Sequence, residues 1–402
     1  MKIVVLAGGF DQIALINELK RRGHQVVLVD YFQNPPARAY ADKHIVASTL
    51  DVERVRDIVL EEKADLLCTA CTDQALLTVA NVSGQLGLPC YISYETALNV
   101  TNKSYMKRRM MECGIPTAKF IILDKLDLSR LSGFEYPLVV KPVDCNSSKG
   151  VKKVMSEEEL VSALNDAMQF SRTGSAIVEE FKSGTEISAD FYIENGQAKY
   201  LSATSSVKIG NRKSFTIMGS VYPAVTPEQK ERICKVASQI ADGFGLDNCP
   251  LLIQLIVNGD KVDVIEFSAR MGGGTKYKLI EVLSGVNIMS EYVDMILGAR
   301  PSVNPTEMKG FCRMNYIYCN PGTLDRVEGL EELKRKGLIV DYFLYKTKGM
   351  KITASETSGD RAAGYLLIAD SQEEMMRKVS LADSSVKVLS SEDEDIMIHN
   401  LM

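Results

Sequence analysis

The sequence predicts a multidomain protein of mixed α/β and α+β class, on three observations. Its 402 residues are too many for one compact core, so two or more domains are expected. Strand and helix signals alternate through the N-terminal part, which is typical of a parallel sheet with right-handed crossovers. Beyond residue 184, Asn195–Gly196 and Asn258–Gly259 each lie between two apolar runs, which predicts antiparallel hairpins.

The N-terminal elements follow one another in order. The strand signals are KIVVLAG, HQVVLVD, DKHIVAS, ADLLCTA and PCYIS. Helices are predicted at Ile13–Arg22 and at Asp51–Lys63, where apolar residues recur at helical spacing. Gly8, Gly9 and Asp30 suggest a dinucleotide fold, but the spacing G-x-G-x-x-G is absent. Nicotinamide binding is therefore the less favoured interpretation.

The middle of the chain predicts a small unit of strands and one helix. AKFIILD, EYPLVVKP and AIVEEF are strand signals. Ser156–Phe170 is predicted as a helix, because Ser156 and Glu159 have capping-box spacing and an apolar face follows. A later helix is predicted from Thr226, with Pro227 at its first position and a second capping box. The C-terminal part is predicted as further strands with a short helix.

The register of the second hairpin decides which side chains share a face. Alternate residues of a regular strand point the same way, here Val262, Val264, Glu266, Ser268 and Arg270. A two-residue turn at Asn258–Gly259 pairs Gln254 with Asp263, on the face opposite to Glu266. A turn one residue longer pairs Gln254 with Val264 and brings it to the face of Glu266. A metal site requires the shared face.

Small polar residues follow the strand that ends in Lys141. The stretch VVKPVDCNSSKGV lacks the Walker pattern and, alone, fits a surface turn rich in Asn, Ser and Gly. Lys103 and Lys141, together with backbone N–H groups of this loop, would complement a polyphosphate. An acid, a hydroxyl and an arginine at alternate positions of VDVIEFSAR indicate either an edge-strand surface or, as we favour, the wall of a cleft.

The order of these parts along the chain resembles that of the ATP-grasp enzymes, in particular the carboxylate–amine ligases. The parts are the alternating strands and helices, the small unit that follows them, and then the two hairpins. The resemblance extends from residue 1 to about residue 300. It implies a Rossmann-like N-terminal domain followed by an ATP-grasp fold, with ATP held between a lid and a central domain. It divides the chain into a Rossmann-like domain (1–100), a linker helix with the lid (101–183), a central domain with the metal and phosphate site (184–308) and a C-terminal α+β segment that packs on the core (309–402).

The resemblance also assigns the nucleotide contacts. TNKSYMKRRMMECGIPT and the lid loop imply phosphate contacts from Lys103, Lys141, Ser147, Ser148 and Gly150. VEEFKSGTE looks like the segment that meets adenine and ribose, which implies a binding stretch of Glu179, Glu180, Phe181, Lys182 and Glu186. Within it, Glu180 and Lys182 would offer backbone groups to the base, and Glu186 would accept the ribose hydroxyls.

EFSARMGGG resembles the pattern E-x-N-x-R-x-G-G of the same family. Glu266 would then ligate Mg²⁺, with Mn²⁺ as an alternative, and Arg270 and Lys141 would be the catalytic residues. Two positions depart from the pattern, because Ser268 stands in place of Asn and Gln254 in place of an acidic ligand. Both can offer oxygen to magnesium but lower the charge of the site. Either a second metal binds weakly, or the nucleotide supplies more of the coordination.

The resemblance implies a ligase that passes the γ-phosphoryl group of ATP to a small-molecule carboxylate, so that an amine can displace phosphate and ADP is released. Two alternatives remain at this point. One is an ATP-binding protein of the same fold with weak or no turnover, and the other is a nicotinamide-dependent oxidoreductase. Candidates for binding a substrate anion are Arg270, Lys276 and Arg212, and the last two are equally well explained as surface cations.

Composition argues against several kinds of partner. A net charge of -5 disfavours nucleic acid and anionic membranes, and no apolar run approaches the ~18 residues of a membrane span. The nine cysteines are scattered along the chain, which is typical of reduced thiols in a cytoplasm. The resemblance to the carboxylate–amine ligases implies a small carboxylate and an amine as partners, and the sequence leaves a homodimer open.

Overall fold

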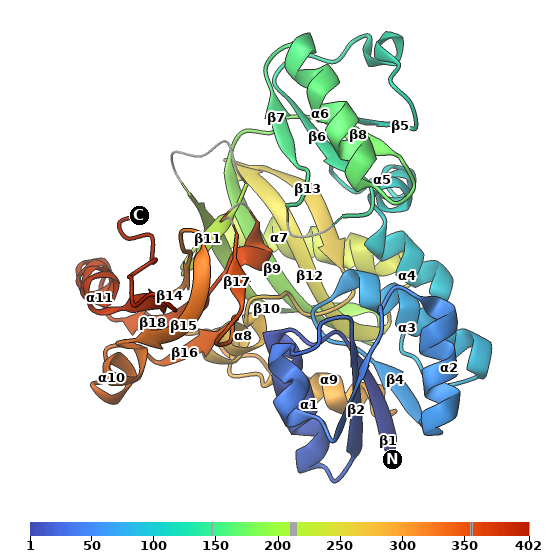
Figure 1. The fold of residues 1–402 in the computed structure, drawn as a ribbon. Coiled ribbons are helices and arrows are strands. Elements are labelled where there is room, and N and C mark those ends of the chain that lie inside the picture. Colours follow the sequence, from blue (N-terminus) through green and yellow to red (C-terminus); the bar gives the residue numbers. More distant parts are fainter. Residues whose placement is uncertain (146–147, 210–214, 354, 356, 402) are drawn as a thin grey trace.

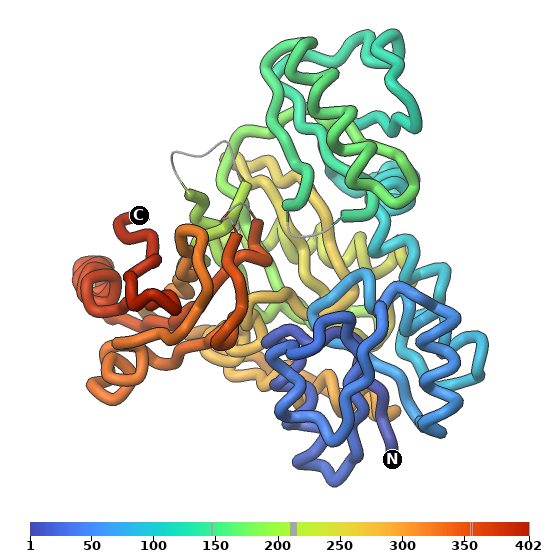
Figure 2. Tube along the Cα trace, viewed as in Figure 1, coloured from blue at the N-terminus to red at the C-terminus, as the bar shows by residue number. Residues whose placement is uncertain are grey.

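The computed structural model describes residues 1–145, 148–209, 215–353, 355 and 357–401. Two residues named above, Ser147 and Arg212, lie outside the described residues. In Figure 1 the N-terminal lobe (blue) and the C-terminal strands and helices (orange to red) flank a central sheet, and the small lid (green) projects from its end. Figure 2 shows the chain leaving the N-terminal lobe, forming the lid and returning to build the central sheet.

The N-terminal lobe is built on a parallel sheet, as predicted. Its strands are β1 (Lys2–Leu6), β2 (Gln25–Asp30), β3 (Lys43–Val46) and β4 (Leu66–Cys68), in the order β3-β2-β1-β4. Its helices are α1 (Phe10–Arg21), η1 (Pro36–Tyr40), α2 (Val52–Glu62), α3 (Asp73–Leu86) and α4 (Tyr94–Thr101). The strand predicted at PCYIS is wrong: the segment is irregular, and its Tyr91 hydroxyl donates to the carbonyl oxygen of Ala269 at 3.0 Å. It therefore packs against the central domain and not in the sheet.

The lid follows α5 (Lys103–Glu112) and is an antiparallel sheet with one helix. Its elements are β5 (Phe120–Leu123), η2 (Leu128–Leu131), β6 (Leu138–Pro142), β7 (Lys152–Val154), α6 (Glu157–Phe170) and β8 (Ala176–Glu180). The sheet order is β5-β8-β6-β7, and α6 covers one face. Sequence reasoning missed β7, which has three residues and two exposed lysines. The predicted helix is confirmed, with the Ser156 hydroxyl capping its first turn.

One eight-stranded sheet forms the centre of the molecule. Its central strands are β9 (Thr185–Glu194), β10 (Gln197–Lys208), β11 (Ile217–Tyr222), β12 (Asn248–Asn258) and β13 (Lys261–Ser268). The C-terminal segment adds β14 (Phe311–Ile317), β16 (Asp341–Leu344) and β18 (Ala363–Ala369), giving the order β13-β12-β9-β10-β11-β14-β18-β16. Residues beyond 309 therefore extend the central sheet itself.

The remaining elements cover the sheet and complete the C-terminal part. The helices of the central part are α7 (Pro227–Gly243), α8 (Lys276–Ser284) and α9 (Ile288–Ile296). The C-terminal part adds β15 (Gly322–Glu328), α10 (Leu330–Arg335), β17 (Lys351–Ile352), η3 (Ser358–Asp360), α11 (Gln372–Ser385) and β19 (Lys387–Ser390), with a sheet β17-β15-β19. The capping box predicted for α7 is present between Thr226 and Gln229.

The two faces of the central sheet have opposite character. Ile187, Ala189 and Phe191 of β9 are buried in the main core, on the side that α7 covers. The alternate residues Glu186 and Ser188 line the cleft described below. This alternation follows from the two-residue period of a strand and gives the cleft a polar floor over an apolar core.

The second hairpin differs from both registers that the sequence allowed. Its turn has two residues, Gly259 and Asp260, because Asn258 pairs with Lys261. A bulge at Ile265 then shifts the register, so that Leu255 pairs with Val264 but Gln254 pairs with Glu266.

The bulge also changes which side chains share a face. Val264 is buried in the core with Phe267, whereas Glu266 and Ser268 line the cleft. The prediction that Val262 and Val264 share a face with Glu266 and Ser268 is therefore wrong, because the extra residue reverses the alternation. The predicted shared face of Gln254 and Glu266 does exist. In the described part of the chain, no helix combines the length and apolar composition that would span a membrane.

Candidate active site

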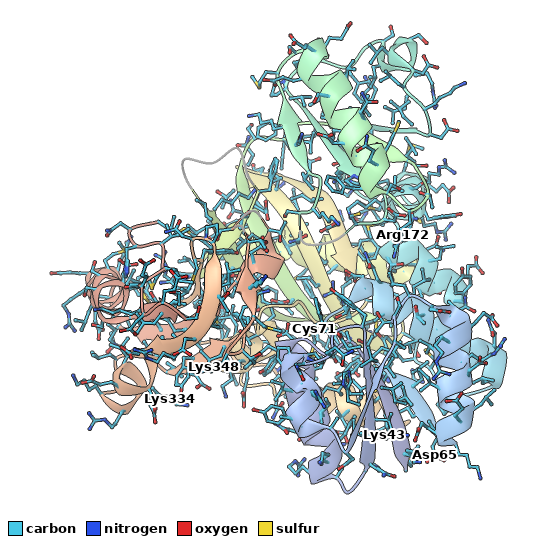
Figure 3. The ribbon with its side chains drawn as sticks, viewed as in Figure 1. Lys43, Asp65, Cys71, Arg172, Lys334 and Lys348 are labelled. Atoms are coloured by element: carbon cyan, nitrogen blue, oxygen red, sulfur yellow. The ribbon has the colours of Figure 1, made fainter. Side chains whose placement is uncertain are left out.

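A cleft of about 1240 Å³ lies where the N-terminal lobe, the lid, the central sheet and the C-terminal part meet. Cys71, at the end of the first lobe's sheet, lies on its wall and near the middle of the molecule in Figure 3. Most of the side chains singled out from the sequence line this cleft, and they divide into several clusters.

A buried carboxylate between two lysines lies at the junction of α5 with the lid. Glu179 Oε1 is 2.8 Å from Lys107 Nζ, and Glu179 Oε2 is 2.6 Å from Lys141 Nζ. Burial alone would raise the pKa of Glu179, but the two lysines outweigh it and lower the pKa to about 2. The predicted phosphate ligand Lys141 is thus held rigidly, and the cluster keeps one positive charge in excess.

Sequence reasoning missed Lys107, although a signal was present. Lys103 and Lys107 are four residues apart on α5, so they lie on the same face of that helix. Both are almost fully buried. Lys107 also donates to the carbonyl oxygen of Val264 at 3.2 Å, next to the bulge of β13.

Glu266 lies opposite Gln254 and beside Lys103. The distance from Lys103 Nζ to Glu266 Oε2 is 3.2 Å, and Lys103 also donates to the carbonyl oxygen of Cys145 at 2.7 Å. Burial would raise the pKa of Glu266, but Lys103 and Lys141 lower it, so the carboxylate is ionised. Ser268 lies two residues further along the same face and is buried.

The donor set of this cluster suits magnesium. A carboxylate from Glu266, an amide oxygen from Gln254 and a hydroxyl from Ser268 are hard oxygen ligands. Among the described residues there is no group of three His, Cys, Asp or Glu side chains that could hold a metal ion by themselves. Magnesium is commonly held by one or two carboxylates with substrate phosphates and water, so these residues fit it only in that form.

Arg270 is fixed by the N-terminal lobe. Its Nε donates to Asp73 Oδ1 at 2.7 Å, and its Nη2 donates to the other oxygen of the same carboxylate. Its Nη1 donates to the carbonyl oxygen of Met271 at 2.6 Å. Three of the five N–H bonds of the guanidinium are thereby used, and two remain for a ligand.

Asp73 and Asp11 were both missed from the sequence. Each lies in the first turn of a helix that follows a strand of the parallel sheet, where carboxyl ends of strands commonly form binding sites. The Asp11 carboxylate accepts from the backbone N–H groups of Gly274 and Thr275 at 3.0 and 2.8 Å. The glycine-rich loop after β13 is therefore held against the N-terminal lobe. Gly274 has φ +72°, and a Cβ there would collide with the guanidinium of Arg361.

The lid loop is anchored at its first residue. The carbonyl oxygen of Asp144 accepts from Gln74 Nε2 at 3.2 Å and from Arg172 Nη2 at 3.0 Å, and Figure 3 shows Arg172 where the lid meets the lobe below. Ser148 lines the cleft, whereas Gly150 does not. Gly150 has φ +72° and packs against Pro142 and Phe170, so it shapes the turn behind the loop.

The segment predicted to meet adenine also lines the cleft, from Glu179 to Lys182. The N–H groups of Glu180 and Phe181 already donate to the carbonyl oxygens of Lys119 and Pro137, at 3.0 and 3.1 Å. Neither N–H group is therefore available to a base. Lys153 Nζ lies 3.7 Å from the centre of the Phe181 ring. The Glu186 carboxylate is 2.6 Å from Lys208 Nζ.

Two further cations stand at the other end of the cleft. Lys276, which the sequence left open as a surface cation, is buried; its Nζ donates to Thr204 Oγ1 at 2.8 Å and lies 3.6 Å from Asp190 Oδ2. Arg361 lies 3.6 Å from the centre of the Tyr316 ring and was not foreseen. It has no ion-pair partner in the described part of the chain. The C-terminal part therefore contributes directly to the cleft.

Comparisons with known proteins agree with this architecture. Residues 134–278 match the model of the ATP-grasp domain. Phosphoribosylamine–glycine ligase of Thermococcus kodakarensis is 25% identical over 407 residues, which cover 94% of this chain and 91% of that protein.

Solved structures give the same fold. L-amino acid ligase from Bacillus licheniformis aligns with a TM-score of 0.79 at 22% identity, over 97% of this chain and 98% of that one. The biotin carboxylase domain of 2-oxoglutarate carboxylase from Hydrogenobacter thermophilus was solved with MgADP and bicarbonate. It aligns with a TM-score of 0.79 at 18% identity, over 100% of this chain and 92% of that one. The predicted fold is confirmed.

Proposed function

This chain carries an ATP-grasp domain, and we propose that it is an ATP-dependent ligase that activates a small-molecule carboxylate for attack by an amine. The observation that carries the proposal is the convergence of Lys103, Lys141, Glu266 and Arg270 in one cleft. These side chains come from α5, the lid, β13 and the loop after it, and each is buried or half-buried and held by a named partner. Rigid cations at a site that excludes water are what phosphoryl transfer requires.

In the proposed complex, the ATP phosphates lie against Lys103, Lys141 and the N–H groups of the lid loop. The base lies against Phe181, and Glu186 is near the ribose. Magnesium, held by Glu266 with Gln254 and Ser268, would neutralise the charge of the phosphates. The two N–H bonds of Arg270 that Asp73 and Met271 leave unused would be available to the transferring phosphoryl group.

The chemistry proceeds in two steps. A carboxylate oxygen of the substrate attacks the γ-phosphorus, the bond from that phosphorus to the β–γ bridging oxygen breaks, and ADP leaves with an acyl phosphate formed. The amine nitrogen then attacks the acyl carbon, the bond from carbon to the phosphate oxygen breaks, and phosphate and a proton leave. Lys141 and Arg270 stabilise the charge on the phosphoryl oxygens, and closure of the lid protects the acyl phosphate from water.

The substrates would bind at the end of the cleft beyond the glycine-rich loop. Arg361 is buried there and forms no ion pair with any of the described residues, so it is suited to hold an anionic group of the acid or the amine. Two of the similar proteins are named as ligases of amino acids: one joins phosphoribosylamine to glycine, and the other is an L-amino acid ligase. We infer the same class of substrates here. All nine cysteines are free thiols, which supports the cytoplasm as the place of action.

The nicotinamide alternative loses support at Asp30. Its carboxylate accepts from the N–H groups of Gly8 and Phe32, at 2.6 and 2.8 Å, so it already serves to hold the turns that follow β1 and β2. A Cβ added at Gly8 would collide with Pro35, so this glycine is explained by the packing of the turn after β1. An ATP-binding protein without turnover remains the second candidate, since Gln254 removes a charge from the metal site.

The test is phosphate release from Mg-ATP across a panel of small carboxylates, each with and without amines. Release that needs both partners and is lost in Glu266→Ala supports the ligase. Glu231→Ala, an exposed glutamate on α7, is the matched control and should retain activity. Tight ATP binding with no release for any pair would favour the second candidate.

A further inference from the structure

Tyr31 and Phe32 form an exposed aromatic surface on the side of the cleft that the N-terminal lobe provides. They directly follow β2, line the cleft and are 61% and 50% exposed, and their ring centres lie 4.0 Å apart. Leu50, just before α2, lines the same cleft and is 42% exposed. Ligand sites are lined mainly by apolar and aromatic side chains that the ligand covers. These three residues therefore indicate a ligand with an apolar part.

This aromatic surface is held in a fixed position. The Asp30 carboxylate accepts from the N–H group of Phe32 at 2.8 Å. Pro35 and Pro36 restrict the backbone that follows. Asp30 also accepts from the N–H group of Gly8 at 2.6 Å, which joins the loop to the turn before α1. A surface that is already ordered binds a ligand with a smaller loss of conformational entropy.

A series of aromatic rings leads from the N-terminal lobe to Arg361. Phe10, the first residue of α1, lines the cleft, and its ring centre lies 5.5 Å from that of Tyr345. The ring centre of Tyr345 lies 6.1 Å from that of Tyr316, and the Arg361 guanidinium lies 3.6 Å from the centre of the Tyr316 ring. A ligand that extends from Arg361 toward the N-terminal lobe would therefore lie along these rings.

Two cations accompany these rings and suit an anionic group of the ligand. Arg361 forms no ion pair with any of the described residues, and Lys346, which also lines the cleft, donates to the carbonyl oxygen of Gly359 at 3.0 Å. The carboxylates of Asp11 and Asp30 already accept backbone N–H groups and so hold the loops of this wall together. A ligand with an anionic group at one end and an apolar group at the other matches this arrangement.

We propose that one substrate is an amino acid with a large apolar side chain, aromatic or branched aliphatic, whose carboxylate Arg361 holds and whose side chain lies on Tyr31 and Phe32. The proposal rests on the proposed function, because it takes the Arg361 end of the cleft as the substrate site. Tyr31 and Phe32 would determine which side chain is accepted and would take no part in phosphoryl transfer. A substrate with a small or strongly polar side group would leave both rings exposed.

Binding of L-tryptophan to the full-length protein, with ADP and Mg²⁺ present, tests this without turnover. The chain contains no tryptophan, so the fluorescence anisotropy of the ligand reports its own binding. L-Phenylalanine, L-leucine, glycine and ribose 5-phosphate are then compared as competitors. We expect L-tryptophan to bind, and we expect L-phenylalanine and L-leucine to displace it at concentrations at least about tenfold lower than glycine or ribose 5-phosphate.

Variants show where the side chain of the ligand lies. Tyr31→Ala and Phe32→Ala should each weaken the binding of L-phenylalanine about tenfold and leave the affinity for ADP unchanged. Phe32→Leu keeps an apolar surface and should retain most of the binding. Tyr94→Ala is the matched control, because Tyr94 is 46% exposed on α4 and does not line the cleft, and it should change neither affinity. Circular dichroism checks that the variants are folded, and the wild-type competition does not depend on them.

Each outcome decides. The inference would be overturned, with the ligase proposal intact, if glycine or ribose 5-phosphate bound as tightly as L-phenylalanine, or if none of the three apolar amino acids bound. Unchanged binding of L-phenylalanine in both alanine variants would overturn it equally. Binding that depends on Tyr31 and Phe32, together with no phosphate release for any pair in the panel, would overturn the ligase proposal and leave the apolar site standing.

Discussion

Asp73→Asn asks whether the N-terminal lobe sets the position of Arg270. The pair is desolvated, since each side chain is only 11% exposed, and two N–H bonds of the guanidinium donate to the carboxylate. Asparagine keeps one oxygen for Nε but turns an amino group toward Nη2 and removes the negative charge. Arg270 would then lose the alignment of its two free N–H bonds.

The size of the effect follows from the lost contact. A hydrogen bond between charged groups contributes about 1.5–3 kcal/mol, which corresponds to roughly a 10- to 100-fold fall in turnover if it is felt in the transition state. ADP does not touch Asp73 in the proposed complex, so its affinity should stay the same. Phosphate release measures the first quantity, and calorimetric titration with ADP measures the second.

Asp51→Asn is the matched control. Asp51 caps α2 in the same lobe and does not itself line the cleft, and asparagine caps a helix equally well, so activity should be retained. Wild-type turnover in Asp73→Asn would refute the positioning role. A parallel loss of ADP binding would show that the pair only maintains the fold.

Three further predictions concern other parts of the cleft and the lid beside it. The pKa of Glu179, about 2 against an ordinary 4.5, lies below its unfolded value, so its stabilisation is present above pH 4.5 and is lost as the pH falls toward 2. In urea denaturation, the free energy of unfolding of Glu179→Gln should be about 3 kcal/mol lower than that of the wild type at neutral pH. This difference should narrow below pH 4.5. A difference that stays constant with pH would contradict the pKa given to Glu179. Gly150→Ala should speed amide hydrogen exchange in the lid more than Gly174→Ala does. Both glycines have positive φ, but only at Gly150 would the added Cβ collide with neighbours, Pro142 and Phe170, at 2.9 Å. Equal exchange rates in the two variants would refute this steric explanation. Arg361→Met should raise the KM of one substrate roughly 10- to 100-fold without changing ADP affinity, whereas the exposed Arg335→Met should not, and an unchanged KM would remove Arg361 from the substrate site.

The sequence was informative where a local pattern determines structure. The alternation of strands and helices predicted the parallel sheet. The pair Asn195–Gly196 predicted a hairpin turn, and in the structure these two residues form the turn, both with positive φ. The strand predicted at PCYIS failed because Pro89 and Cys90 are exposed and Tyr91 bonds to the central domain, so the segment does not join the sheet. A single sequence does not show which neighbour buries an apolar segment.

The active-site geometry depended on features that have no local signal. The bulge at Ile265 adds one residue to β13, and nothing in VDVIEFSAR distinguishes it from a regular strand. Without the bulge, the two-residue turn would have placed Gln254 and Glu266 on opposite faces. Asp73 reaches Arg270 across nearly 200 positions of the chain, so only the tertiary structure reveals the pair. Lys107, in contrast, could have been found from its spacing to Lys103.

The central claim is that a carboxylate of the substrate receives the phosphoryl group. Once the panel has identified an acid and an amine that support phosphate release, the acid is supplied with ¹⁸O in both carboxylate oxygens and the released phosphate is analysed by mass spectrometry. The account predicts one ¹⁸O atom in the phosphate, because the carboxylate oxygen bound to phosphorus leaves with it when the amine attacks the acyl carbon. Phosphate without ¹⁸O, or ¹⁸O found in AMP, would contradict it.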